Sequence, residues 1–146
     1  MKLEVINIEK IKPYKQIRKW GKSINLLMDS IKDFGFINPI LITEDYKVIC
    51  GNTRLIAAEK CGLKEIPCII INSLNEDQIK AYRLIDNQVG EFTLWDYKRK
   101  GEEIKTIKMN LFKYGLPEYY LTDINIDNFF EKTGFEQVSL FEEDIL

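Results

Sequence analysis

The fold is decided by one stretch of this chain of 146 residues, Val48-Ile49-Cys50-Gly51-Asn52-Thr53-Arg54-Leu55-Ile56-Ala57-Ala58-Glu59-Lys60-Cys61-Gly62. It begins with apolar residues that suit a short strand, and Gly51 can adopt the backbone angles of a sharp turn. A helix follows, for which Asn52 or Thr53 can serve as the N-cap. Its apolar stripe comprises Leu55, Ala58 and Cys61. Gly62 stands where a left-handed C-cap is expected, so the stretch predicts a strand, a glycine turn and a helix.

The turn from Gly51 to Arg54 is our first candidate binding site. Backbone N–H groups at a helix N-terminus lack intrahelical acceptors and favour an anion, and a glycine allows a phosphate to approach closely. Arg54 lies within the first helical turn and can direct a forked pair of hydrogen bonds at phosphate oxygens. The alternative is an ordinary strand-to-helix turn with a solvated arginine, because most such turns bind nothing.

Composition excludes several classes of protein. A hydrophobic content of 45% is enough for a core, and no apolar run is long enough to cross a membrane. The start of the chain lacks the apolar segment of a signal peptide, so we expect a cytoplasmic protein without a membrane partner. The sequence contains no histidine, which excludes Ser-His-Asp catalysis and histidine-bearing metal sites.

The three cysteines lack CxxC spacing, so we expect reduced thiols and no structural zinc, and we assign no metal ligands. Cys50 stands beside the glycine turn. We interpret it as a buried cysteine, with a nucleophile as the alternative.

The net charge of −2 conceals an uneven distribution of charge. Residues 1–22 contain seven Lys or Arg against two Glu, whereas residues 116–146 contain eight Asp or Glu against one Lys. We interpret this split as a basic face for phosphates and an acidic tail kept away from it. The acidity of the whole chain argues against tight, sequence-independent DNA coating, so we expect DNA binding by this chain alone to be weak.

The first part of the chain predicts a strand, a loop and a helix. Residues 5–11 are rich in Val and Ile, which is consistent with a strand, and residues 13–21 are expected to form a basic, aromatic loop. Gln16 and Arg18 in this loop are candidate nucleotide ligands, and a solvated connection is the equal alternative. Amphipathic spacing predicts a helix from residue 23 to the glycine at residue 35.

Further strands flank the central stretch. Residues 40–42 and 46–49 predict a hairpin whose turn contains Glu44 and Asp45. Residues 66–71 form a continuous apolar run, which predicts a strand buried on both faces.

Two helices complete the predicted elements. Residues 75–78 resemble a capping box, and the helix they open is expected to end around the polar cluster 86–91. Asp86 and Asn87 in that cluster can contact a ribose, a base or a metal ion, with solvated groups at a helix C-terminus as the alternative. A last long helix with a basic surface is predicted over residues 94–114, followed by an aromatic helical segment and an acidic end.

Three stretches, in this order, carry a family resemblance. The first is Leu27-Met28-Asp29-Ser30-Ile31-Lys32-Asp33-Phe34-Gly35-Phe36-Ile37-Asn38-Pro39-Ile40. The second is Gly51-Asn52-Thr53-Arg54-Leu55-Ile56-Ala57-Ala58. The third is Leu84-Ile85-Asp86-Asn87-Gln88, followed by Glu91 and Trp95-Asp96. They resemble the helix before a Pro-Ile strand, the GxxR box and the Asp-Asn box of the ParB N-terminal domain, within the ParB/sulfiredoxin superfamily. The likeness covers residues 5–96 and is to the short phage and mobile-element type.

The resemblance implies an α+β fold, a compact ParB/sulfiredoxin-like domain with a small mixed sheet packed with helices and a small helical C-terminal appendage. The GxxR turn of this family binds nucleoside phosphates, so we expect a nucleoside triphosphate, CTP or ATP, with Mg²⁺ as a possible companion. The implied nucleotide-binding residues are Gln16, Arg18, Gly51, Asn52, Thr53, Arg54, Asp86 and Asn87. Residues 1–96 would form the nucleotide-binding domain, and residues 97–146 a helical C-terminal extension with an acidic tail.

The chain departs from the family pattern at three points. Partitioning proteins place an arginine three positions after the Asn of their Glu-Asn box, where this chain has Gly90, which disfavours a partitioning-type CTP clamp. Sulfiredoxins carry their catalytic cysteine two positions before the box arginine, where this chain has Asn52, which disfavours sulfinic acid repair. We also find no helix-turn-helix module, so recognition of a specific DNA site would have to come from elsewhere.

We therefore predict a nucleotide-binding, DNA-associated accessory or regulatory protein of a phage or mobile element, with a homodimer as a possible assembly. The first alternative is an enzyme of the same fold, a ParB-like nuclease, NTPase or kinase, with Asp86 and Glu91 as candidate catalytic residues. Glu9 and Asp96 are further carboxylates, and sequence spacing does not show whether the four converge. The second alternative is a protein-interaction module without nucleotide binding.

Overall fold

A computed structural model describes residues 1–15, 22–92 and 96–116 of the chain. The chain divides into two compact units. The first comprises Met1–Thr93 together with Lys113–Gly115, and the second comprises Leu94–Phe112 and Leu116–Leu146. The domain boundary expected after residue 96 stays a prediction.

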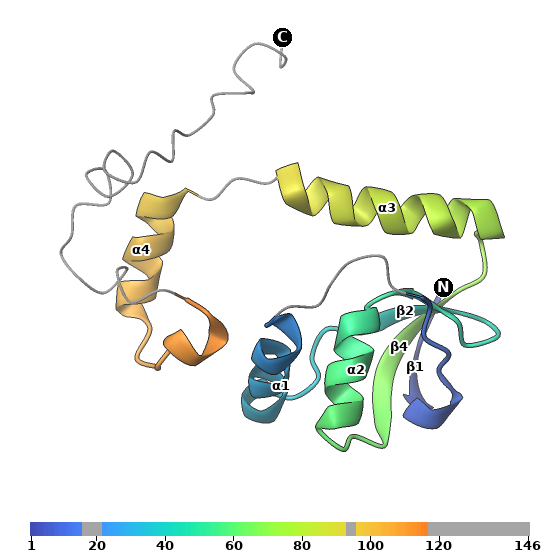
Figure 1. The fold of residues 1–146 in the computed structure, drawn as a ribbon, viewed down its shortest axis with the longest axis horizontal. Helices are drawn as coiled ribbons and strands as arrows, with labels where there is room; N and C mark the ends of the chain where they lie inside the picture. The colour runs from blue at the N-terminus through green and yellow to red at the C-terminus, as the bar shows by residue number, and fades with distance from the viewer. Residues whose placement is uncertain (16–21, 93–95, 117–146) are drawn as a thin grey trace, which may run out of the picture. The chain divides into compact units, whose positions relative to one another are not determined.

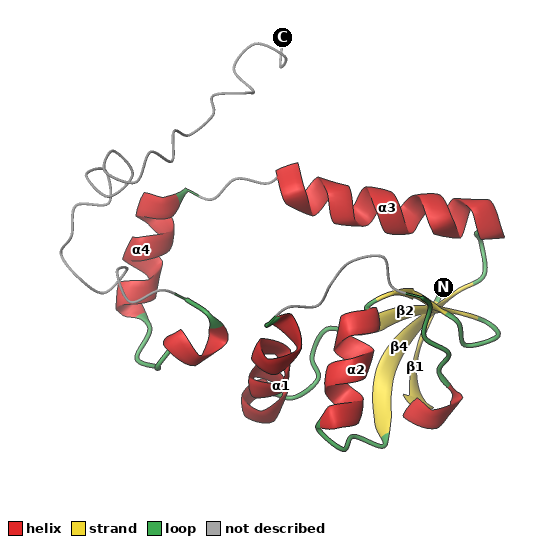
Figure 2. Ribbon diagram, in the orientation of Figure 1, coloured by secondary structure: helices red, strands yellow, loops and turns green. Residues whose placement is uncertain are grey.

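The first unit is built on a mixed sheet of four strands among its described residues (Figures 1 and 2). The strands are β1 Lys2–Asn7, β2 Ile40–Thr43, β3 Val48–Cys50 and β4 Glu65–Ile71. Their spatial order is β1-β4-β2-β3, with β4 antiparallel to β1 and parallel to β2, and β3 antiparallel to β2. A mixed sheet packed with helices confirms the predicted α+β class.

The core lies on the face of the sheet that carries two helices. These helices are α1 Ser23–Phe34 and α2 Asn52–Lys60. Helix α2 packs against the sheet, and α1 packs against α2. Alternate strand residues point toward α2, so Ile40 and Ile42 of β2 and Cys68 of β4 are fully buried beside Leu55. The predicted strand, turn and helix of the central stretch are confirmed.

The opposite face of the sheet is exposed to solvent along β1. Leu3 and Val5 are 63% and 65% exposed, and they pair with Ile69 and Pro67 of β4, which are half-buried. The prediction that residues 66–71 are buried on both faces is therefore wrong. One face of the apolar strand β4 is covered by α2. The other face is not covered by a complete layer of other residues.

The segment after β1 is held beside the edge strand β3. The strand ends at Asn7, earlier than predicted, because the Asn7 side chain accepts a hydrogen bond from the Glu9 N–H at 2.9 Å and opens a 3-10 turn. Lys12 then pairs with Lys47, its N–H donating to the Tyr46 carbonyl at 2.8 Å. This pairing places Tyr14 next to β3.

Helix α3, Glu76–Phe92, begins with the predicted capping box. The N–H of Asn75 donates to Gln78 Oε1 and the N–H of Gln78 donates to Asn75 Oδ1, both at 2.9 Å. The helix continues to Phe92, so the polar cluster 86–91 lies inside it, and the prediction that the helix ends there is wrong. The side chains of the cluster are exposed, and polar side chains on the solvent side do not end a helix.

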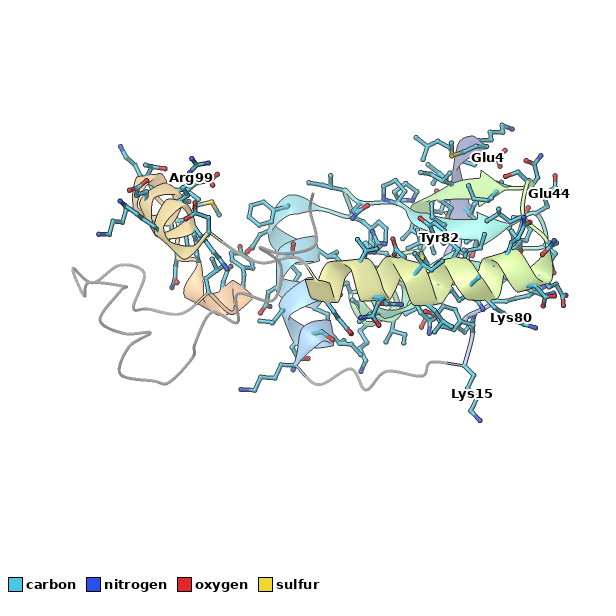
Figure 3. All side chains as sticks on the ribbon, turned by 90° about the horizontal axis from the view of Figure 1, so that it is seen from above. Glu4, Lys15, Glu44, Lys80, Tyr82 and Arg99 are labelled. Carbon is cyan, nitrogen blue, oxygen red and sulfur yellow. The ribbon has the colours of Figure 1, made fainter. Side chains whose placement is uncertain are left out.

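The second unit contains α4, Tyr97–Thr106, whose N-cap Asp96 accepts a hydrogen bond from the Arg99 N–H at 3.0 Å. Arg99 is exposed on this helix (Figure 3). The backbone becomes extended at Ile107, so the single helix predicted over residues 94–114 is wrong. The predicted aromatic segment and acidic tail lie outside the described residues. Among the described residues, none of the helices combines the length and apolar character needed to cross a membrane.

Candidate functional site

The candidate site begins where β3 ends and α2 starts. Gly51 has a φ of +105° and forms the N-cap, and its carbonyl accepts the first helical hydrogen bond, from the Leu55 N–H at 2.9 Å. Helix geometry leaves the preceding N–H groups without intrahelical acceptors. The predicted side-chain cap is wrong, because no side-chain hydrogen bond caps α2. The Asn52 amide instead donates to the Tyr14 carbonyl at 3.1 Å.

A glycine is required at position 51 by the protein itself. A Cβ atom there would lie 2.5 Å from Ile40 Cγ2 and 3.1 Å from an Arg54 guanidinium nitrogen. A positive φ is also costly for residues with a Cβ. Backbone strain and the packing of Ile40 therefore account for Gly51, whether or not a phosphate approaches the turn.

Arg54 lies in the first turn of the helix that follows Gly51. One of its terminal nitrogens donates to the carbonyls of Asn38 and Pro39, each at 3.2 Å. Burial lowers the pKa of Arg54, and the nearby Cys50 and Asp86 counter this, so the guanidinium remains charged. Among the described residues its hydrogen-bond partners are backbone carbonyls, so its charge is not neutralised by a contacting carboxylate. A guanidinium has five N–H donors, which leaves several for an anion.

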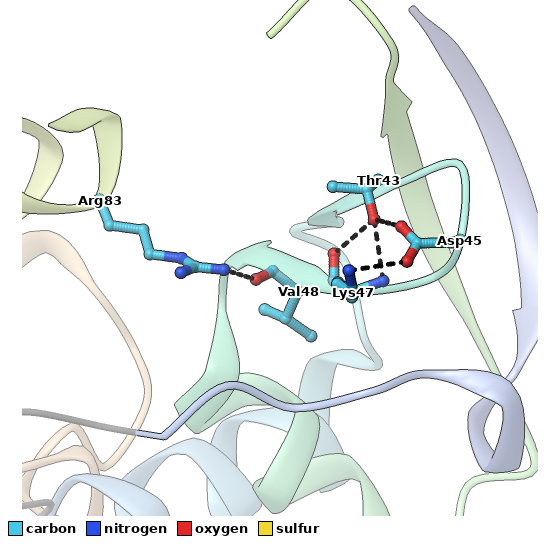
Figure 4. Close-up of polar contacts among 5 residues, drawn as sticks. All are labelled: Thr43, Asp45, Lys47, Val48 and Arg83. Carbon is cyan, nitrogen blue, oxygen red and sulfur yellow. Dashed lines mark hydrogen bonds and ion pairs between the residues drawn. The ribbon is translucent and has the colours of Figure 1, made fainter. Parts of the chain in front are cut away.

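Arg83 is a site residue that the sequence interpretation missed. It lies on α3, and its Nε donates to the Ile49 carbonyl at 3.0 Å while a terminal nitrogen donates to the Val48 carbonyl (Figure 4). Its guanidinium carbon also lies 4.1 Å from the centroid of the Tyr14 ring. The available signal was spacing, because Arg83 precedes Asp86 by three residues and therefore shares its helix face.

Asp86, which the family resemblance implied as a nucleotide ligand, lies next to the strand that leads into this turn. The Cys50 thiol, half-buried at the end of β3, donates to Asp86 Oδ2 at 3.5 Å. Burial in the first place, and the Asp86 carboxylate in the second, raise the pKa of Cys50 to about 11. The thiol is therefore protonated at neutral pH and acts as a hydrogen-bond donor, which disfavours the interpretation of Cys50 as a nucleophile.

Two further predicted residues, Asn87 and Glu91, make hydrogen bonds within α3. The Asn87 side chain donates to the Arg83 carbonyl of its own helix at 2.7 Å, and Glu91 accepts from Gln88 at 3.4 Å. Gln16 and Arg18 lie outside the described residues. The part of the chain that is described contains no group of three or more Cys, Asp or Glu side chains placed to hold a metal ion.

A cavity of about 660 Å³ lies at the other end of β3. It is lined by the hairpin turn at Thr43–Lys47, by Ile71 and Asn72 at the end of β4 and by the first turns of α3. The turn from Gly51 to Arg54 does not line it, whereas Arg83 lines it and also donates to the Ile49 carbonyl of β3. In the hairpin turn, the Thr43 hydroxyl donates to Asp45 and the Lys47 ammonium lies 3.0 Å from the same carboxylate (Figure 4).

Fold and site together define a small mixed α/β domain organised around a corner of strand, glycine and helix, with two arginines beside it. The chain belongs to the ParB N-terminal domain family, whose model matches residues 1–88. The family resemblance drawn from the sequence is thereby confirmed, and the phage or mobile-element type stays a prediction.

Curated relatives match parts of the chain. The ParB-like nuclease domain-containing protein YnaK of Escherichia coli is 40% identical over 52 residues, which cover 36% of this chain and 60% of YnaK. The probable chromosome-partitioning protein ParB of Rickettsia bellii is 34% identical over 101 residues, which cover 66% of this chain and 35% of that protein. In both cases the match spans less than two thirds of the relative.

A solved structure shares the fold. The C-terminally truncated chromosome-partitioning protein ParB of Caulobacter crescentus, complexed with CTP-gamma-S, matches with a TM-score of 0.63 and 19% sequence identity. The match covers 83% of this chain and 69% of that one.

Proposed function

We propose that the first unit binds a nucleoside triphosphate, with its phosphates at the turn from Gly51 to Arg54. The observation that carries this proposal is the Arg54 guanidinium at the start of α2. It is held by the carbonyls of Asn38 and Pro39, and no carboxylate among the described residues contacts it. An anion there gains charge-assisted hydrogen bonds from the guanidinium and from the backbone N–H groups of the helix. Family membership and the CTP-gamma-S in the Caulobacter ParB structure support a nucleotide as that anion.

Each residue has a role in this proposal. Gly51, Asn52, Thr53 and Arg54 hold the phosphates, and Asp86 accepts hydrogen bonds from ribose hydroxyls. Asn87, Gln16 and Arg18 supply further contacts. Mg²⁺ would arrive with the phosphates, which suits its preference for phosphate oxygens, water and one or two carboxylates over an all-protein cage.

The nucleotide would act as a switch in a DNA-associated accessory protein of a phage or mobile element. Exposed Lys98 and Arg99 on α4 give the second unit basic groups for weak phosphate contacts. An enzyme is the second candidate, favoured by the likeness to a nuclease domain-containing relative, with Asp86 and Glu91 as candidate catalytic residues. A protein-interaction module without nucleotide is the outcome if no nucleotide binds.

Calorimetric titration tests nucleotide binding directly. The full chain is titrated with CTP and with ATP, each with Mg²⁺, alongside the variants Arg54→Ala and Lys60→Ala. Both substitutions remove one positive charge from α2, but Lys60 is exposed at the far end of the helix. We expect Arg54→Ala to abolish detectable binding and Lys60→Ala to bind like the wild type. Equal affinity in all three proteins would refute the site, and no binding of either nucleotide would refute the function.

Phosphate release distinguishes an enzyme from a switch. The wild type and the variants Asp86→Asn and Glu91→Gln are incubated with the bound nucleotide, with and without DNA. Turnover that one of these variants loses while it retains affinity for nucleotide would identify an enzyme. Binding without turnover in the wild type supports the switch.

A further inference from the structure

Helix α3 is attached to the sheet mainly through one polar side chain. Within its described side chains, only Ile79 and Arg83 are not exposed. Apolar residues that would normally pack a helix against its neighbours are largely exposed, with Leu84 61% and Ile85 60% exposed. Apolar burial therefore contributes little to the position of this helix.

The Arg83 guanidinium makes three contacts with segments that lead to the turn from Gly51 to Arg54. It donates to the carbonyls of Val48 and Ile49, the last two residues before Cys50, and stacks on the Tyr14 ring. The Tyr14 carbonyl in turn accepts from Asn52 in the first turn of α2. A planar fork that bridges two carbonyls and stacks on a ring is specific to arginine, because a lysine ammonium is a single point of charge.

Asp86 depends on this attachment. It stands one helical turn beyond Arg83, and its contact across to the sheet is the hydrogen bond from the Cys50 thiol at 3.5 Å. Cysteine is a weak donor, so this bond is too weak to hold α3 by itself. The side of the candidate site that belongs to α3 is therefore placed by Arg83.

We propose that Arg83 is a positioning residue, which fixes α3 beside β3 and thereby sets Asp86 beside the Gly51–Arg54 turn. Its effect on nucleotide affinity rests on the proposed function, whereas its effect on the position of α3 does not. Two readouts separate these claims.

The first readout is alkylation of Cys50 by iodoacetamide, an uncharged reagent, followed by mass spectrometry in the absence of nucleotide. Release of α3 uncovers Cys50, so we expect labelling to be several-fold faster in Arg83→Ala and Arg83→Lys. Loss of the positive charge alone would raise the pKa of Cys50 and slow the reaction, so the direction of the change identifies the cause. Wild-type or slower labelling in both variants would overturn the proposal.

Two controls accompany this experiment. Lys80→Ala removes a positive charge one turn earlier on α3, where the ammonium lies 3.7 Å from Asp77 on the same helix, and it should label like the wild type (Figure 3). Cys68 is fully buried in the core, so its own labelling rate reports global unfolding. Faster labelling of Cys50 together with an unchanged Cys68 supports the proposal, and a parallel rise of both counts against it.

The second readout is affinity for CTP and ATP in a double-mutant cycle of Arg83→Ala and Asp86→Ala. We expect roughly tenfold weaker binding in each single variant, and a double variant that stays close to Asp86→Ala, because Arg83 acts through Asp86. Losses that multiply to about a hundredfold would show that Arg83 acts independently and overturn the positioning role. If neither nucleotide binds the wild type while Cys50 labelling rises as described, the positioning of α3 stands and the proposed function fails.

Discussion

Helix α2 follows β3 directly and helix α3 contacts β3, but the two helices are held there by different forces. Leu55, Ala57 and Ala58 of α2 are fully buried, whereas Leu84 and Val89 of α3 are about three-fifths exposed. The hydrophobic effect holds α2 through many non-directional contacts. A few directional hydrogen bonds and one cation–π contact hold α3.

Because of this difference, we expect the two sides of the candidate site to differ in the free energy needed to open them locally. The turn that carries Arg54 adjoins the fully buried core residues of β2 and α2, and such regions open only on global unfolding. The α3 side has few buried apolar contacts, so it opens locally at a lower free energy. A ligand that contacts both sides would thus meet a fixed turn from Gly51 to Arg54 and an adjustable helix.

The largest expected effect is on the packing of α2. Leu55→Ala removes a fully buried side chain and should lower the free energy of unfolding by about 3 to 4 kcal/mol. The matched change on α3, Leu84→Ala, should alter it by less than about 0.5 kcal/mol, because that side chain is exposed. Denaturant titration of both variants measures the difference, and similar losses would mean that α3 is packed as firmly as α2.

A second prediction concerns the turn between the strand and α2. Gly51→Ala should lower the free energy of unfolding by about 2 to 3 kcal/mol, since the new Cβ meets both an unfavourable φ and the Ile40 side chain. Gly62→Ala has a similar φ of +76° but open space around the new Cβ, and should cost about 1 kcal/mol. Equal losses in the same denaturant titration would remove the role of Ile40.

The capping box of α3 offers a smaller and more local test. Asn75→Ala removes one of two reciprocal hydrogen bonds and should cost about 1 kcal/mol of helix stability. Because α3 opens locally, hydrogen exchange should become faster in its first turns and remain unchanged in α2. Equal acceleration in the two helices would show that they open together.

The smallest expected effect is on the titration of Cys50. Its pKa of about 11 predicts that the rate of Cys50 alkylation rises with an inflection near that pH, about two units above an ordinary thiol. Asp86→Asn should shift the inflection downward by removing a negative charge that opposes the thiolate. Because the unfolded thiol loses its proton first, this group weakens the folded state as pH rises from about 9 to 11. An inflection near pH 9 in the wild type would contradict the burial of Cys50.

Local patterns in the sequence predicted much of the fold. The spacing around Leu55 located α2 and its buried face, and the reciprocal pairing of Asn75 and Gln78 could be deduced from the capping-box pattern. The same reasoning failed at residues 86–91, because polar residues suit an exposed helix interior as well as a helix end. It also failed for β4, because a continuous apolar run does not reveal that one face of the sheet is left open.

The residues of the candidate site also differ in how far the sequence could predict them. Gly51 and Arg54 could be identified from a contiguous stretch, because a turn and the helix after it are set by neighbouring residues. Asp86 was selected by family resemblance, and its contact with Cys50 spans 36 positions along the chain. Arg83 went unrecognised, because its spacing of three residues from Asp86 is a weak signal that many solvated arginines on helices share.

The sequence by itself determined a strand, a glycine turn and a helix that begins with an arginine, because short-range sterics and apolar periodicity act within a few residues. Only the tertiary structure decided that α3 lies beside β3 and that Arg83 joins Tyr14 and two strand carbonyls. Those contacts depend on where distant segments lie in space, because a hydrogen bond forms only when its donor and acceptor are placed to within a few tenths of an ångström.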